Sequence, residues 1–116
     1  MQVQLNTDDN VEGREELIDK VEAEVAAALS RFADRLTRVE VHLGDENAGK
    51  SGAADKRCMM EARPSGQQPV AATHKAATLE EAYEGAAEKL GNLLESKFGR
   101  LHDRKGAASI RDNDRR

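Results

Sequence analysis

The central stretch of this chain reads Thr37-Arg38-Val39-Glu40-Val41-His42-Leu43, in which apolar and polar side chains alternate. Successive side chains of a β-strand point to opposite faces of a sheet, so this alternation predicts a strand with one buried face. Val39, Val41 and Leu43 would face the core, and the side chains between them would face solvent. The neighbouring segments must then supply the rest of the sheet and a cover for its apolar face.

Three further segments are predicted to be strands. Residues 1–5 alternate in the same way, and residues 56–63 place Cys58, Met60 and Ala62 on one side. A Gly- and Asp-rich loop over residues 44–55 precedes that second segment. Residues 64–69 contain two prolines and a glycine, which favour a turn, and they lead into a short strand at residues 70–75.

Two segments have the spacing of amphipathic helices. Residues 13–33 carry an apolar stripe, and a second stripe runs from Leu79 to about Lys105. Thr78-Leu79-Glu80-Glu81 forms a capping box at the start of the second helix. Gly85, Gly91 and Gly99 each cost about 1 kcal/mol of helix stability relative to alanine, and we expect close packing at these positions. The stripe residues, with the alternatives that the spacing leaves open, are Leu17, Val21, Val25, Ala28 or Leu29, and Phe32, then Leu79, Ala82 or Tyr83, Ala86, Leu90, Leu93 or Leu94, and Leu101.

These segments predict an α+β fold with the order β-α-β-β-β-α, in which two helices pack on one face of a four-stranded sheet. The 116 residues suffice for one domain, which we place at residues 1–105, and the polar tail at 106–116 is expected to be disordered. No membrane span is expected, since there is no apolar run of about 18 residues. The single cysteine, Cys58, excludes an internal disulfide and fits a cytoplasmic protein.

Several motifs resemble parts of enzyme sites. Residues 44–51, Gly-Asp-Glu-Asn-Ala-Gly-Lys-Ser, match the phosphate-binding pattern G-x-x-x-x-G-K-[ST]. That loop requires a helix at its Lys-Ser end, whereas a strand is predicted here, so no nucleotide is expected at Gly44–Ser51. Cys58 is expected to be a buried, inert thiol, and His42, His74 and His102 lack the spacing of metal ligands. We therefore predict no catalytic residue, no metal and no cofactor.

The distribution of charge indicates a polyanionic partner. Residues 97–116 hold seven Lys or Arg and three Asp, so they carry a net charge of +4, and the remaining 11 basic and 19 acidic residues give −8. Basic residues also cluster near Arg31, Arg35 and Arg38 and on the predicted strands and last helix. Several cations on one surface are what recognition of phosphates requires. The same residues could instead form cross-strand ion pairs or interact with helix dipoles.

The chain resembles the short ribosome hibernation-promoting factors, also called ribosome-associated inhibitors or ribosomal subunit interface proteins. The resemblance covers residues 1–105 and rests on the segment order together with the blocks Met1-Gln2-Val3-Gln4-Leu5, residues 35–43, residues 55–63, and Ala76-Ala77-Thr78-Leu79 through Lys89-Leu90. It implies a non-enzymatic translation regulator that binds the small ribosomal subunit near the decoding region. Such a protein occupies the space of messenger and transfer RNA and keeps ribosomes inactive under stress.

The resemblance also implies which residues contact ribosomal RNA. The best candidates are Lys56, Arg57, Lys75, Lys89, Lys97, Arg100 and Arg104, and weaker ones are Arg31, Arg35 and Arg38. An alternative remains open, because the net charge is −4 and the helices carry many glutamates. The chain could be a divergent protein-interaction or regulatory module that does not bind ribosomes.

Overall fold

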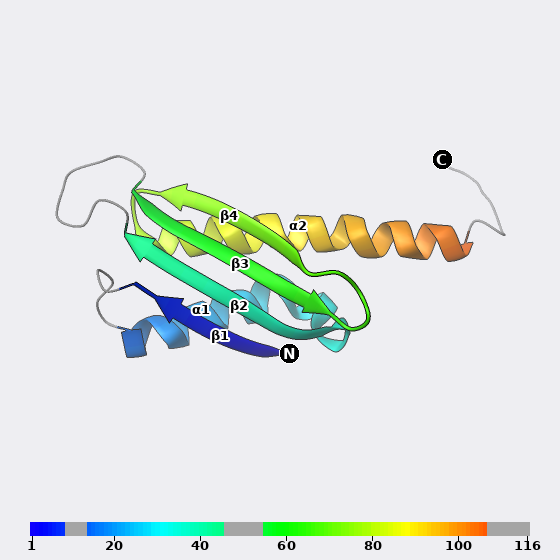
Figure 1. The fold of residues 1–116 in the computed structure, drawn as a ribbon, viewed down its shortest axis with the longest axis horizontal. Helices are drawn as coiled ribbons and strands as arrows, with labels where there is room; N and C mark the ends of the chain where they lie inside the picture. Colours follow the sequence, from blue (N-terminus) through cyan, green and yellow to red (C-terminus); the bar gives the residue numbers. More distant parts are fainter. Residues whose placement is uncertain (9–13, 46–54, 107–116) are drawn as a thin grey trace.

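The structure is a computed structural model that describes residues 1–8, 14–45 and 55–106, with the backbone alone for Arg14 and for residues 100–106. Figure 1 shows its elements in chain order. These are β1 (Gln2–Thr7), α1 (Arg14–Leu29), the 3₁₀ helix η1 (Ser30–Arg35), β2 (Leu36–Asp45), β3 (Lys56–Pro64), β4 (Val70–Ala76) and α2 (Leu79–Gly106). The predicted α+β fold and its β-α-β-β-β-α order are confirmed.

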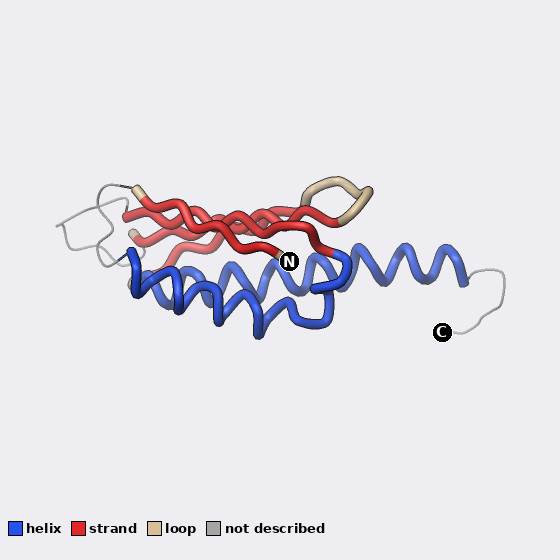
Figure 2. The backbone as a smooth tube through the Cα atoms, turned by 90° about the horizontal axis from the view of Figure 1, so that it is seen from below, coloured by secondary structure: helices blue, strands red, loops and turns tan. Residues whose placement is uncertain are grey.

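The four strands form one sheet in the order β1-β2-β3-β4. β1 runs parallel to β2, and the other two pairs are antiparallel. A parallel pair needs a long crossover, which α1 provides. Both helices lie on the same face of the sheet (Figure 2), as the apolar stripes predicted. The opposite face of the sheet carries no helix from the described part of the chain (Figure 2). The C-terminal turns of α2 extend past the end of the sheet (Figure 1).

The core lies between the sheet and the helices. The predicted inward residues of β2 and β3 are buried, and the helices contribute Val21, Val25, Leu29, Ala86, Leu90 and Leu94. Where the sequence left a choice, Leu29 is buried more fully than Ala28, and both Ala82 and Tyr83 are buried. Leu94 is 0% exposed, whereas Leu93 is 44% exposed. The buried stripe of α2 therefore passes through Leu94, and Leu93 projects beside it.

The first helix is shorter than predicted. A single helix was expected over residues 13–33, but α1 ends at Leu29 and the chain tightens into η1. A 3₁₀ helix rises further along its axis per residue than an α-helix and has fewer residues per turn. The six residues of η1 therefore connect the end of α1 to the start of β2 at Leu36. Phe32 is buried in η1, where its ring lies 5.5 Å from that of Phe98. Its burial continues the apolar spacing of α1, so periodicity alone could not reveal the change of helix type.

Two features at the start of α2 explain its position against β4. The Thr78 hydroxyl accepts a hydrogen bond of 3.1 Å from the Glu81 amide, as the capping box predicted. The His74 ring then packs against Gly85, and a Cβ at that position would overlap the ring. Close packing is thus the reason for glycine at 85. It is not the reason at 99, where a Cβ would meet nothing within 4 Å.

Gly85→Ala is expected to destabilise the fold, because the new methyl group forces the His74 ring or α2 to move. Overpacking of this kind costs about 1–3 kcal/mol, offset by about 1 kcal/mol of helix propensity. Gly99→Ala meets no neighbour and should gain the propensity alone. Urea denaturation followed by circular dichroism measures both changes. A Gly85→Ala protein as stable as Gly99→Ala would contradict this account of the helix–strand contact.

Candidate nucleic-acid interface

The largest gathering of predicted RNA-binding residues lies along the β4 edge of the sheet. A groove between β4 and α2 is lined by Ala72, Thr73, Lys89, Asn92, Leu93 and Ser96. The Lys89 ammonium donates a hydrogen bond of 3.1 Å to the Thr73 carbonyl, which holds the side chain across the groove. Lys97 follows eight residues later on α2, about 12 Å further along the helix axis. The helix and the edge strand together thus position two of the predicted cations.

Two more predicted residues continue this surface onto the uncovered face of the sheet. Arg57 of β3 and Lys75 of β4 are directly opposite each other in the strand register. Both alternate with inward residues, Arg57 with the buried Cys58 and Lys75 with His74, which packs against α2. We call Arg57, Lys75, Lys89 and Lys97 the basic edge. It joins the open face of β3 and β4 to the side of α2 that adjoins β4.

Lys56 is adjacent in sequence but has a different environment. Its ammonium lies 3.0 Å from Asp55 and 3.4 Å from Asp45, which is its partner in the β2–β3 register. The hydrogen bond to Asp55 and the interaction with Asp45 raise the pKa of Lys56 above its ordinary value of 10.5, against the opposing effect of burial. Two carboxylates therefore balance this charge, and the residue ties the ends of β2 and β3 together.

Arg38 is also engaged within the protein. On the uncovered face of the sheet, its guanidinium lies 2.7 Å from Glu40. Glu40 is further approached by Arg63 at 3.9 Å and by His42 at 3.7 Å, and Arg63 contacts Glu61 at 3.1 Å. The middle of the open face is thus a network of compensated charges, as the cross-strand alternative in the sequence suggested. It offers less net positive charge than the basic edge.

Arg31 and Arg35 lie on η1, beside the stretch of α2 that holds Glu95 and Phe98. The Arg31 guanidinium lies 4.6 Å from the centre of the Phe32 ring, and that of Arg35 lies 5.0 Å from the centre of the Phe98 ring. Arg31 also lies 3.4 Å from the Glu95 carboxylate. Stacking on aromatic rings restricts both side chains. They form a second, smaller basic group on η1, next to the turn of α2 that carries Lys97.

The remaining predicted candidates lie on the part of α2 that extends past the sheet. Arg100 and Arg104 belong to the helix, but their side chains lie outside the described residues. Of the tail predicted at residues 106–116, only Gly106 belongs to the described residues, and it is the last residue of α2. The role of these two arginines in RNA binding stays a prediction.

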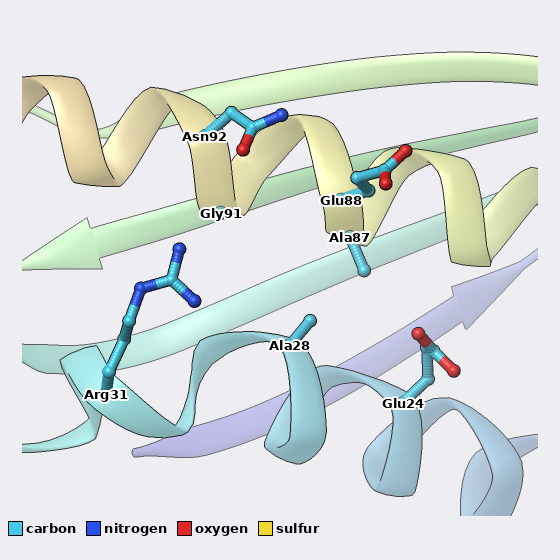
Figure 3. A pocket seen from close by; sticks show the side chains of 7 residues that line it. All are labelled: Glu24, Ala28, Arg31, Ala87, Glu88, Gly91 and Asn92. Carbon is cyan, nitrogen blue, oxygen red and sulfur yellow. The ribbon is translucent and has the colours of Figure 1, made fainter.

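The face formed by the two helices is acidic. A groove of about 210 Å³ between α1 and α2 has Glu24 and Glu88 at one end and Arg31 and Asn92 at the other (Figure 3). An adjoining groove is lined by Glu24, Glu81, Glu84, Gly85 and Glu88. Desolvation beside the neighbouring side chains raises the pKa of Glu84, and repulsion from Glu80, Glu24 and Glu81 raises it further. A polyanion would meet this face unfavourably.

Cys58 is placed as the sequence predicted. Its side chain is 0% exposed within the core, and burial raises the pKa of the thiol from 9.0 to about 12, with a small opposing effect of Arg57. The thiolate, which is the reactive form, is therefore disfavoured. Cys58 is a packing residue of β3.

The reaction of Cys58 with a thiol reagent at pH 8 should be at least tenfold slower in the folded protein than in urea. Because the folded pKa is raised, burial of the neutral thiol contributes stability that is fully present below pH 9 and is lost as the pH rises through about 12. Absorbance after addition of an aromatic disulfide measures the labelling rate. Equal rates in the folded and unfolded protein would contradict burial of this thiol.

The other enzyme-like signals are not gathered into a site. His42 lies on the open face beside Glu40, whereas His74 contacts α2, and the side chain of His102 is not described. Residues 1–8, 14–45 and 55–99 contain no group of three or more His, Cys, Asp or Glu side chains placed to hold a metal ion. The phosphate-loop pattern at Gly44–Ser51 falls mostly on residues 46–54, outside the described residues, and β3 begins at Lys56. None of the three helices in the described residues has the length and apolar character needed to cross a membrane.

Comparison with known proteins identifies the class. Residues 6–102 match the model of the family described as Sigma 54 modulation protein / S30EA ribosomal protein. This match covers most of the chain, so the protein belongs to that family. No curated protein gives a match.

Solved structures show the same fold. The N-terminal domain of Thermus thermophilus Protein Y is 23% identical, with a TM-score of 0.67 over 84% of this chain and 99% of that domain. A ribosomal subunit interface protein from Coxiella burnetii is 13% identical, with a TM-score of 0.66 over 85% of this chain and 99% of that one. At these identities the likeness establishes the architecture alone.

Sequence reasoning missed the uncharged residues of the candidate interface. Leu93, Asn92, Ser96 and Thr73 line the groove beside Lys89 but were not predicted to belong to a site. A signal was present, since Lys89, Leu93 and Lys97 recur every four residues and so lie along one side of a helix. Reading Leu93 as an alternative core position hid this pattern.

Proposed function

We propose that this protein is a ribosome-associated translation inhibitor that acts without enzymatic chemistry. It binds the small ribosomal subunit and its RNA near the decoding region and sterically excludes messenger and transfer RNA. It thereby keeps cytoplasmic ribosomes inactive under stress, including stationary phase. The observation that carries this proposal is the family match over residues 6–102. The name of the Coxiella burnetii structure, a ribosomal subunit interface protein, agrees with it.

The distribution of charge supports binding to RNA in spite of the net charge of −4. Phosphate contacts depend on the local arrangement of cations and not on the total charge of a chain. The basic edge places Arg57 and Lys75 on the open face of β3 and β4 and Lys89 and Lys97 on α2 beside β4, and the carboxylates between α1 and α2 lie on a different face. The protein therefore has one border suited to RNA and a face that RNA would avoid.

A steric mechanism requires a rigid domain and does not require reactive side chains. The strands and helices pack around one continuous core, which resists compression. A domain of this kind, seated where two RNA ligands normally bind, would exclude them by occupying their volume. Regulation would then follow from the amount of protein and from its affinity, which depends on salt.

A competition experiment tests the steric mechanism. Small subunits programmed with a short messenger RNA bind labelled transfer RNA on a filter, and increasing amounts of this protein are added. We expect retained transfer RNA to fall as the protein saturates the subunits. Unchanged transfer RNA binding at saturating protein would contradict steric exclusion, even if the protein were bound to the subunit.

A second candidate function is a protein-interaction module that does not act on ribosomes. The acidic grooves between α1 and α2 favour it, because their glutamates would suit a basic protein surface. Affinity purification from a nuclease-treated lysate distinguishes the two functions. Recovery of one non-ribosomal protein in equal amount would support the module, and recovery of ribosomal components alone would count against it.

A further inference from the structure

The groove between β4 and α2 differs electrostatically from the grooves between the helices. Lys89 is the only charged residue among its six lining residues, and the lining contains no carboxylate. The two grooves between α1 and α2 contain two and four glutamates. Among these three grooves, all formed by described residues, only the one at the sheet edge would attract an anion.

Lys89 is already oriented for such a ligand. Its bond to the Thr73 carbonyl uses one of the three ammonium hydrogens, and the side chain stays exposed. The other two hydrogens can reach a ligand in the groove. Because the side chain is held in place, less rotamer entropy is lost on binding than for a free lysine.

Leu93 adds an apolar surface next to this charge. It is 44% exposed, and Met1 is the only other large hydrophobic residue of the described chain that is comparably exposed. Lys89 lies one helical turn before it and Lys97 one turn after it. The side of α2 along the groove thus presents a cation, an apolar side chain and a second cation in order.

We propose that this groove holds a single strand of RNA, with phosphates on Lys89 and Lys97 and a base or ribose on Leu93. The inference rests on the proposed function and names the part of the protein that contacts the nucleic acid. The charged-apolar-charged order matches a polynucleotide strand, in which phosphates alternate with nucleosides. Asn92, Ser96 and Thr73 supply hydrogen-bonding groups that can meet ribose hydroxyls.

The geometry favours RNA over an extended acidic peptide. A peptide would add to the free edge of β4 through backbone hydrogen bonds. The Thr73 carbonyl already accepts a hydrogen bond from Lys89, so strand addition would have to displace that side chain. Lysines at an edge also discourage pairing with another strand, including β4 of a second copy. RNA uses the same lysines as ligands and needs no displacement.

Lysine footprinting tests the groove directly. The protein is acetylated briefly with and without small ribosomal subunits, and the modification of each lysine is measured by mass spectrometry. Lys89 and Lys97 should be modified at least fivefold more slowly in the complex, and the protection should vanish after ribonuclease digestion. Lys20, exposed on α1, is the matched control and should not change.

The outcomes separate this inference from the proposed function. Co-sedimentation with unprotected Lys89 and Lys97 would overturn the groove and leave ribosome binding intact. Protection that survives ribonuclease would indicate a protein partner and also overturn it. Failure to co-sediment would remove the proposed function, and single-stranded polyuridylate then replaces the subunits as the probe. Protection by polyuridylate supports the groove, and its absence overturns it.

Discussion

Leu94→Ala is expected to lower the free energy of unfolding by about 2–5 kcal/mol, a large fraction of the stability of a small domain. Leu94 is 0% exposed in the core between α2 and the sheet. Truncation removes its transfer free energy and leaves a cavity, since α2 is held on both sides of this position by other buried residues. Urea denaturation monitored by circular dichroism measures the change, and the dependence on denaturant should remain that of one cooperative transition.

The neighbouring residue provides the control. Leu93→Ala makes the same chemical change at a side chain that is 44% exposed, so the free energy of unfolding should fall by less than about 1 kcal/mol. The same substitution should nevertheless weaken RNA binding if the groove is correctly assigned. Equal destabilisation by the two substitutions would contradict the orientation of α2.

Lys89→Glu is expected to weaken ribosome binding by about 10- to 100-fold at moderate salt. A hydrogen bond to a charged group contributes about 1.5–3 kcal/mol, and the new carboxylate also repels the phosphate. The slope of log affinity against log salt should become shallower by about 0.7–0.9, the value expected for one lost phosphate contact. Sedimentation binding curves at four salt concentrations give both quantities.

Lys20→Glu is the matched control, because it makes the same change of charge at an exposed lysine of the other helix. Its affinity should stay within about threefold of the unaltered protein. Circular dichroism should show that both variants are folded. If the two substitutions weakened binding equally, the effect would come from total charge, and the basic edge would lose its special role.

The fold could be predicted because its signals are local. The alternation at Val39, Val41 and Leu43 needs only a period of two, and Thr78 caps α2 through a residue three positions away. The prediction was wrong at Ser30–Arg35, where the helix tightens to a 3₁₀ helix. Both helix types bury Phe32, so the sequence pattern does not distinguish them.

The candidate site could be predicted only as a set of residue types. Lys56 and Lys89 look alike in the sequence, yet Lys56 lies between two carboxylates from different segments, and Lys89 contacts a backbone carbonyl across a groove. Arg57 and Lys75 become neighbours only through the β3–β4 register. Such pairings depend on tertiary structure and cannot be predicted from the spacing of residues along the chain. The roles of all these residues in RNA binding stay predictions.

The position of the glutamates also needed the structure. In the sequence they reduce the basic character of the last helix and favour a partner other than RNA. In the fold, Glu84 and Glu88 of α2 line a groove shared with Glu24 of α1, away from the β4 side of α2. Basic and acidic residues of α2 thus lie on different sides of the helix, so an acidic chain is compatible with the proposed RNA-binding groove.

Co-sedimentation of the unaltered protein with separated ribosomal subunits tests the central claim most directly. We predict that the protein pellets with the small subunit at low salt and not with the large subunit. If about five phosphates are contacted, log affinity should fall with log salt with a slope of about −3.5 to −4.5. Absence of association with the small subunit at low salt, or equal association with both subunits, would contradict the proposed function.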